Sequence, residues 1–434
     1  MKRSNFGLFA VLLFMYSFVL SCKNDVQKLP DSGLFRADVV TLDSGSVQTP
    51  SDVPKFIYGT QTFPRLTDIN NLSGPRLKVL QGGDLEIQET AGSVITSSQF
   101  SGYTTPNLEY RVVEGVVKPL NNKSLTLLSA GFQFDTLINK IEALTGLRED
   151  EFFQGFQEFN IIYHPAVKLQ ISDEQIRKYE TTNAAYIAGV KQFALFTSGK
   201  DERVPMAFNP QIISHEFGHA IFEKTFFDNK YERCAIGTYK EQKIFPGRLE
   251  SEFVIRGINE GFADFVSFVW TGSSNILQAS LGDSVNTRER DFSSADFDYR
   301  DFSFEGTDVC RGRFYCIGTL WAKTLFEVYK SRSLDPKNVD ARQAYLREIV
   351  GVLTMVGETL RAFDGDRLPV PDDMASRCQT RDYLSPSYDE DVLAAFFEAF
   401  IDNVDSAQRK NYCDAIAKHF DTSAFPNSSR GSCK

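Results

Sequence analysis

The chain is poor in histidine and has no excess of positive charge. Its 434 residues include only four histidines, and 57 acidic against 47 basic residues give a formal net charge of −10. It lacks a basic stripe with interleaved aromatic residues, so we expect no nucleic-acid partner. It also lacks a C-x-x-C pair and an internal repeat. These absences argue against a zinc finger, a thioredoxin-type redox site and a solenoid.

The longest apolar run near the start is too short for a comfortable transmembrane helix. Residues 6–20 are apolar and follow the basic residues 2–3, a pattern typical of an export signal. The run ends in "VLSC", which resembles the lipobox of bacterial lipoproteins. The resemblance implies removal of residues 1–21, a lipid on Cys22, and anchoring to a bacterial membrane at the outer membrane or cell surface. The alternative is an ordinary cleaved signal in which Cys22 is incidental.

Six cysteines remain once Cys22 is set aside. They are Cys234, Cys310, Cys316, Cys378, Cys413 and Cys433. An even number in an exported chain predicts up to three disulfides, whose connectivity the sequence leaves open. The pair Cys310 and Cys316 is the easiest to join locally.

The pattern after the signal predicts an α+β protein in four segments. Residues 22–55 are polar and rich in Ser, Asp and Pro, as expected of a tether. Residues 56–120 contain alternating apolar stretches with Gly and Pro punctuation, which indicates strands. Residues 121–230 mix helical and strand patterns, and residues 231–434 are mainly helical in pattern.

Two stretches of the mixed segment have strand character. Residues 159–171, "FNIIYHPAVKLQI", predict one buried strand. Residues 183–199, "NAAYIAGVKQFALFTSG", predict a hairpin or a pair of edge strands. We therefore expect a sheet in this part of the chain.

The stretch "NPQIISHEFGHAIF" places two of the four histidines on one predicted helix. Asn209 is a good N-cap and Pro210 is tolerated at the first helical position. His215 and His219 are four residues apart, so they share a helix face and can bind one Zn²⁺ at about 2.0–2.1 Å each. Glu216 projects beside them as a general base towards a water that the metal activates. The alternative is a helix whose histidines are only packed or solvated.

A catalytic zinc site needs a further protein ligand, and a second stretch supplies one. "RGINEGFADFVSFVW" contains Glu260 and Asp264, again four residues apart on a predicted helix with apolar flanks. Carboxylates in such surroundings are costly to bury unpaired, and a metal and an imidazole would compensate them. We therefore expect Glu260 to be the third ligand. Asp264 would accept a hydrogen bond from a zinc-bound histidine, His215 in the first place. A solvated helix face is the alternative.

His-Glu-x-x-His followed by Asn-Glu-x-x-x-Asp resembles the thermolysin-like and fungalysin-like zinc metallopeptidases of the gluzincin clan. Thermolysin is itself the example of a His₂Glu zinc site among known proteins. The resemblance implies that Glu216 is the catalytic base and Glu260 the third zinc ligand. It implies a two-lobed zincin-type fold, with an N-terminal mixed α/β lobe and a mainly helical C-terminal lobe. Family members often bind calcium, but this sequence contains no D-x-[DN]-x-[DN]-G loop that would indicate a calcium site.

Two further stretches carry the resemblance. "NAAYIAGVKQFALF" is similar to the family's edge strand, which implies that Asn183 and Ala184 hold an extended substrate. "YCIGTLWAKTLFEVY" is similar to the family's His-x-x-Gly-x-x-Trp-Ala segment. Here Tyr315 stands where the family has an oxyanion-donating His, and a tyrosine hydroxyl can also donate. Other possible donors are Arg311 and Arg313, close to Tyr315 in the sequence. Tyr231 and Tyr239, in the long stretch between the two metal motifs, are further candidates.

These patterns favour a zinc endopeptidase that acts on peptide or protein substrates. A zinc-binding lipoprotein scaffold with weak or no turnover is the second reading, because Tyr315 replaces the family's histidine. An aminopeptidase of the same clan ranks last, because no Gly-x-Met-x-Asn-like element that would grip a free amine lies near residues 183–196.

Overall fold

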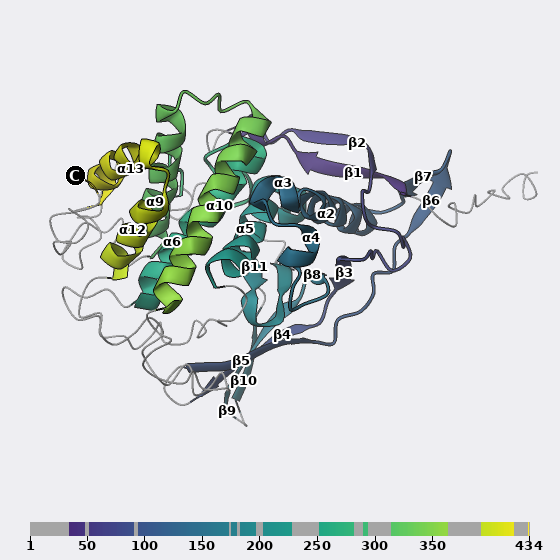
Figure 1. The fold of residues 1–434 in the computed structure, drawn as a ribbon. Helices are drawn as coiled ribbons and strands as arrows, with labels where there is room; N and C mark the ends of the chain where they lie inside the picture. Colours follow the sequence, from purple (N-terminus) through teal and green to yellow (C-terminus); the bar gives the residue numbers. More distant parts are fainter. Residues whose placement is uncertain are drawn as a thin grey trace, which may run out of the picture.

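The computed structural model describes residues 34–47, 52–90, 94–172, 175–179, 183–196, 203–227, 251–281, 290–293, 314–362, 392–420 and 433. The protein is α+β, as the sequence predicts. Its strands lie in the N-terminal half and most of its helical residues in the C-terminal half. Figure 1 shows the helices of the C-terminal half on one side of the molecule and the strands, together with the helix of residues 122–139, on the other, with the helix of residues 210–226 between them.

Twelve described strands form three four-stranded sheets. The strands are β1 Arg36–Leu42, β2 Phe56–Thr62, β3 Leu77–Gln81, β4 Asp84–Thr90, β5 Val94–Ser101, β6 Tyr110–Val113, β7 Val116–Pro119, β8 Phe159–Tyr163, β9 Ala166–Ser172, β10 Gln175–Tyr179, β11 Asn183–Ile187 and β12 Gln192–Phe196. The strand orders are β2-β1-β7-β6, β10-β9-β4-β5 and β11-β12-β8-β3.

The third sheet is the one that reaches the candidate site. Its strands β3, β8 and β12 are parallel to one another, and β11 pairs with β12 in antiparallel register, with Tyr186 opposite Phe193. The hairpin predicted for residues 183–199 is therefore confirmed over its described part, residues 183–196. Because β11 is the end strand of this sheet, one of its edges faces away from β12.

The single strand predicted for residues 159–171 is wrong, because two strands of different sheets occupy it. His164 lies between β8 and β9 with φ +57°, a left-handed conformation that breaks an extended strand. After this break β8 stays in the third sheet, while β9 pairs with β4 and β10.

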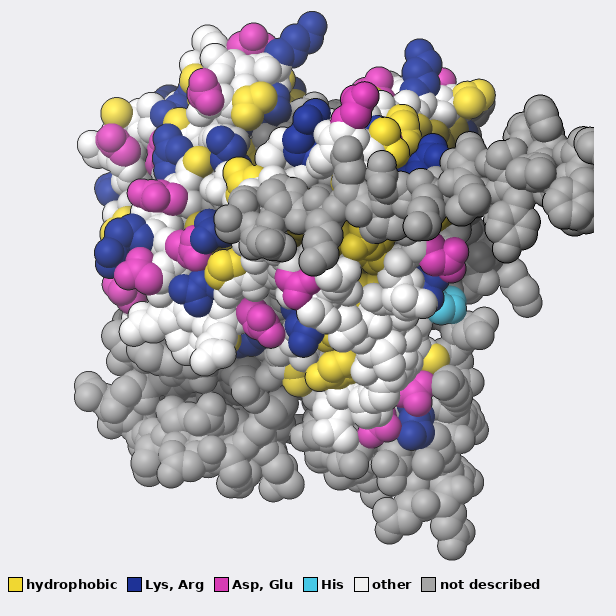
Figure 2. Space-filling view, turned by 90° about the vertical axis from the view of Figure 1, so that its right-hand side faces the viewer, with side chains coloured by type: hydrophobic (Ala, Val, Ile, Leu, Met, Phe, Trp, Pro, Cys, Tyr) yellow, Lys and Arg dark blue, Asp and Glu magenta, His cyan; other side chains and the backbone are white. Residues whose placement is uncertain are grey.

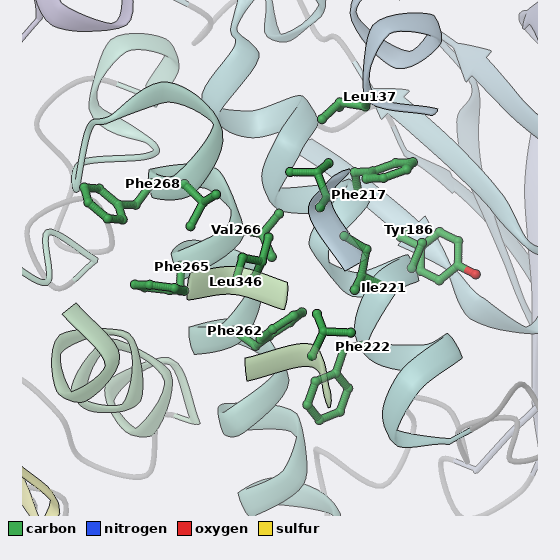
Figure 3. Packing of buried hydrophobic residues seen from close by; sticks show 14 of the residues in the cluster. Leu137, Tyr186, Phe217, Ile221, Phe222, Phe262, Phe265, Val266, Phe268 and Leu346 are labelled. Atoms are coloured by element: carbon green, nitrogen blue, oxygen red, sulfur yellow. The ribbon is translucent and has the colours of Figure 1, made fainter. Parts of the chain in front are cut away.

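The described helices are α2 Asn122–Asn139, α3 Ile141–Thr145, α4 Glu149–Phe152, α5 Pro210–Phe226, α6 Ser251–Thr271, α7 Gln278–Leu281, α9 Phe314–Ser331, α10 Val339–Ala362, α12 Val392–Asn403 and α13 Ser406–His419. Helix α6 packs closely against α5 on one side and α9 on another, and α10 also contacts α5. Figure 3 shows side chains of α5 and α6 facing each other, among them Phe222 and Phe262, whose ring centroids are 5.8 Å apart.

Cys413 and Cys433 form a disulfide, and Cys316 is disulfide-bonded as well. Cys234, Cys310 and Cys378 lie outside the described residues. Among the residues the structure describes, no helix has the length and apolar character needed to cross a bilayer. On the face shown in Figure 2, basic and acidic side chains are interspersed rather than gathered into a patch of one sign.

The buried carboxyl of Asp135 on α2 gives a prediction about stability. Its Oδ2 accepts hydrogen bonds from the backbone N–H groups of Arg65 at 3.0 Å and Leu66 at 3.2 Å, while Oδ1 has no hydrogen-bond partner. Burial raises the pKa of Asp135 to about 6 despite these bonds. A folded-state pKa above the unfolded value means that stability is fully present below about pH 4 and falls as the pH rises through about 6.

We therefore expect Asp135→Asn to stabilise the protein above pH 6. The free energy of unfolding should rise by about 1–3 kcal/mol at pH 7.5 and change much less at pH 4. Urea unfolding at the two pH values measures this difference. An equal change at both pH values would contradict the proposed cause.

Candidate metal centre

Helix α5 presents the first three residues of the site. It begins as predicted: the side chain of Asn209 accepts from the backbone N–H of Gln211 at 3.0 Å, and Pro210 occupies the first turn. His215, Glu216 and His219 are all buried. Every residue from Gln211 to Phe226 is buried, because α6, α10, α2 and β11 surround the helix.

Helix α6 brings the second motif to α5 because both helices have small residues at their crossing. A Cβ added at Gly218 would lie 2.7 Å from the Cα of Ala263, so the helices approach more closely than larger side chains would allow. On the opposite side of α6, Gly261 lies against the backbone of Gly318 on α9. These contacts place Glu260 and Asp264 over the two histidines of α5.

Three possible ligand atoms converge from the two helices. Nε2 of His215 lies 3.1 Å from Nε2 of His219, and Oε2 of Glu260 lies 3.5 Å from the first and 3.8 Å from the second. A tetrahedral ion with bonds of 2.0–2.1 Å requires its ligands to be about 3.4 Å apart. The predicted grouping of these residues is therefore present, with separations that suit one divalent ion.

The hydrogen bonds of the two imidazoles aim their other nitrogens at the same point. Nδ1 of His215 lies 2.8 Å from Oδ1 of Asp264, and since a carboxylate only accepts, Nδ1 is the donor. Nδ1 of His219 likewise donates to Oδ1 of Asn259 at 2.9 Å. When both Nε2 atoms are unprotonated, their lone pairs face each other at 3.1 Å, and a cation between them would stabilise this arrangement. His215, Glu216 and His219 together form a buried group that could hold a metal ion.

The electrostatics of the centre favour a positive charge at that point. Burial and the guanidinium of Arg290 lower the pKa of His215, but its hydrogen bonds to Asp264 and Glu260 outweigh them and raise it to about 9. Burial would raise the pKa of Glu260, yet His219, Arg290 and His215 hold that pKa well below its usual range. At neutral pH an ionised Glu260 thus faces a positive charge, which a divalent cation can supply in place of the proton.

Glu216 lies next to the ligand group and is fixed by strand β11. Its Oε2 accepts a hydrogen bond from the backbone N–H of Tyr186 at 2.8 Å. Burial raises the pKa of Glu216 above its usual value. A buried carboxylate with a raised pKa beside a candidate metal site has the properties of a general base.

The same hydrogen bond shows which way the edge of β11 faces. Backbone groups of a strand alternate in direction, so the N–H and C=O of Ala184 point to the same side as the N–H of Tyr186, towards Glu216. Ala184 is buried, and Asn183, at the start of the strand, is exposed. Of the two predicted substrate-binding residues, Ala184 therefore turns its backbone to the outer edge of β11, beside the candidate metal site, while the backbone of Asn183 faces β12.

Tyr315 lies in the first turn of α9 and packs against the site. Its ring covers the guanidinium of Arg290, whose Cζ is 4.9 Å from the ring centroid. The charge of Glu260 and burial raise the pKa of Tyr315 to about 12. The hydroxyl thus stays protonated, and so able to donate, over the whole neutral range.

Two residues of the centre were not predicted from the sequence. Asn259, the partner of His219, directly precedes Glu260 in the second motif, and that position was the available signal. Arg290 contacts Glu260 and Asp264, but its surroundings in the sequence have no periodic pattern that could point to it. Glu223, one turn beyond His219 on α5, is fully buried and pairs with Lys191 rather than with a residue of the centre.

Several predicted residues lie outside the described residues. These are Cys22, Tyr231, Tyr239, Arg311 and Arg313.

No protein-family model matches the chain, and no curated protein matches its sequence.

Proposed function

We propose that this protein is a zinc-dependent endopeptidase. The observation that carries the proposal is the convergence of His215, His219 and Glu260 within 3.1–3.8 Å, with Glu216 beside them. Two imidazole nitrogens and one carboxylate oxygen are a common donor set for catalytic zinc, and they leave a fourth position open. Asp264 and Asn259 support the ligands by fixing both imidazoles in the metal-binding tautomer.

Each residue of the centre has a role in peptide hydrolysis. Zinc bound there would polarise the scissile carbonyl and lower the pKa of a water to about 7. Glu216 takes the proton from the attacking water and hands it to the leaving amine. The N–H of Tyr186 holds the carboxylate of Glu216 in position for both transfers.

The outer edge of β11, the end strand among the described strands of its sheet, provides a place for the substrate. An extended peptide can add to a sheet edge through backbone hydrogen bonds, which bind regardless of side-chain identity. Along β11 such a peptide would meet the backbone of Ala184 and then pass Glu216. This arrangement supports an endopeptidase with an extended substrate.

The proposal extends to the architecture and the location of the protein. The site lies where the sheet of β11 meets α5 and α6, which is consistent with a two-lobed zincin-type fold of the thermolysin-like kind. In this proposal the chain is exported and attached to a bacterial membrane by a lipid on Cys22. The lipobox-like "VLSC" supports that attachment.

Metal removal tests the function. We expect the purified protein to contain about one zinc per chain and to cleave casein or a peptide library. A zinc chelator should abolish cleavage, and added zinc should restore it, because the open coordination position supplies the chemistry. Cleavage by metal-free protein would contradict the proposal. Stoichiometric zinc without cleavage would instead support a metal-binding lipoprotein scaffold.

The role of Tyr315 can be tested separately. If its hydroxyl donates to the oxyanion, Tyr315→Phe should lower kcat by about 10²-fold and leave the zinc content unchanged. Tyr329→Phe is the matched control, because Tyr329 lies on the same helix and donates to the backbone of Asp335 instead. Full kcat in Tyr315→Phe would assign the oxyanion to another donor.

A further inference from the structure

A buried guanidinium lies against the metal centre. Nη2 of Arg290 donates to Oε2 of Glu260 at 3.1 Å and lies 3.3 Å from Nε2 of His215. The same nitrogen donates to Oδ1 of Asp264, and Nε donates to Oδ2 of Asp264 at 3.3 Å. Because an arginine keeps its proton at any relevant pH, the centre contains a fixed positive charge.

The position of this charge is set from two sides. The carboxylates of α6 lie on one side of the guanidinium, and the ring of Tyr315 on α9 lies on the other at 4.9 Å. Arg290 is only 6% exposed, so water cannot replace these partners. The hydrogen bond from Arg290 to Glu260, a possible metal ligand, is therefore part of the packed interior.

We propose that Arg290 is a permanent counter-charge of the metal centre, which pairs with Asp264 and Glu260 and thereby limits how tightly the centre binds a divalent cation. The inference rests on the proposed metal site. It adds a residue that tunes the site without serving as a ligand.

The charges of the centre support this role. In their ionised forms Glu216, Glu260 and Asp264 contribute three negative charges, and all three are buried. Arg290 and one divalent cation together contribute three positive charges, so the loaded centre is neutral. Without Arg290 the same centre would keep one uncompensated negative charge and attract a cation more strongly.

Glu260 also shares one oxygen between the two partners. Its Oε2 accepts from Arg290 and is the atom that faces both histidines. A lone pair used for Arg290 is less available to a metal, so removal of the guanidinium should free the ligand. Through Asp264, Arg290 also reduces the negative charge felt at Nδ1 of His215, which keeps that imidazole a weaker donor to the metal.

The test is a measurement of zinc affinity. We expect Arg290→Gln to bind zinc about 10–100-fold more tightly than wild type, the range over which outer partners change metal affinity. Arg290→Lys keeps the charge and should stay close to wild type. Lys410→Gln removes one positive charge from an exposed pair with Asp414 and should have no effect. Competition with a chromophoric chelator at fixed pH gives the dissociation constants.

A gain in affinity distinguishes this role from a structural one, because a damaged site would bind zinc more weakly. Equal or weaker binding by Arg290→Gln would overturn the inference. If circular dichroism shows that Arg290→Gln does not fold, the double variant Arg290→Gln/Asp264→Asn is compared with Asp264→Asn. The double variant should then bind zinc at least about tenfold more tightly. If wild type binds no zinc, the proposed function fails instead.

Discussion

Replacing Glu216 by Gln is expected to lower kcat for peptide cleavage by about 10²–10⁴-fold. Glutamine has nearly the same shape, and its amide oxygen can still accept from the N–H of Tyr186, so the side chain should keep its position. It cannot take a proton from water at neutral pH. The loss should therefore appear in kcat, while the metal content stays that of wild type.

Glu223→Gln is the matched control for this experiment. Glu223 is also a buried carboxylate of α5, but it pairs with Lys191 rather than with the metal ligands. This variant should keep most of the activity, even if removal of the charge lowers stability. Cleavage by Glu216→Gln at the wild-type rate would remove Glu216 from the mechanism. Loss of zinc from Glu216→Gln would make that residue a ligand instead of a base.

The grouping of the candidate metal ligands was largely predictable because helical geometry is local. Residues four apart on a helix share a face whatever surrounds them, so His215 with His219 and Glu260 with Asp264 could be paired from spacing alone. The apolar flanks of the second pair then indicated burial. The 2.8 Å contact of Asp264 with His215 agrees with the pairing expected from the sequence.

The parts that escaped prediction depend on contacts between distant segments. Arg290 meets Glu260 only because the fold brings a separate short segment onto α6. The break at His164 combines a left-handed conformation at a residue other than glycine with Pro165, and this proline was the local signal against one continuous strand. The order of strands in the sheets likewise follows from long-range pairing, such as that of β4 with β9.

The second large effect is expected from a glycine next to a proposed ligand. A Cβ added at Gly261 would lie 2.1 Å from the carbonyl oxygen of Gly318, and further backbone atoms of Gly318 lie at 2.8 and 2.9 Å. Likewise, a Cβ added at Gly318 would lie 2.9 Å from the carbonyl oxygen of Gly257 and 2.9 Å from the backbone nitrogen of Gly261. No flexible side chain can move aside, so an alanine must push α6 and α9 apart.

Gly261→Ala should therefore lower the free energy of unfolding by about 3 kcal/mol or more, at the upper end of overpacking effects. Zinc affinity should fall with it, because the adjacent Glu260 moves relative to the histidines of α5. Gly351→Ala on α10 is the control: an added Cβ there meets nothing within 4 Å, and alanine should stabilise the helix by about 0.5–1 kcal/mol. Urea unfolding and zinc titration of both variants measure the contrast. Similar behaviour of the two variants would mean that the crossing of α6 and α9 does not position Glu260.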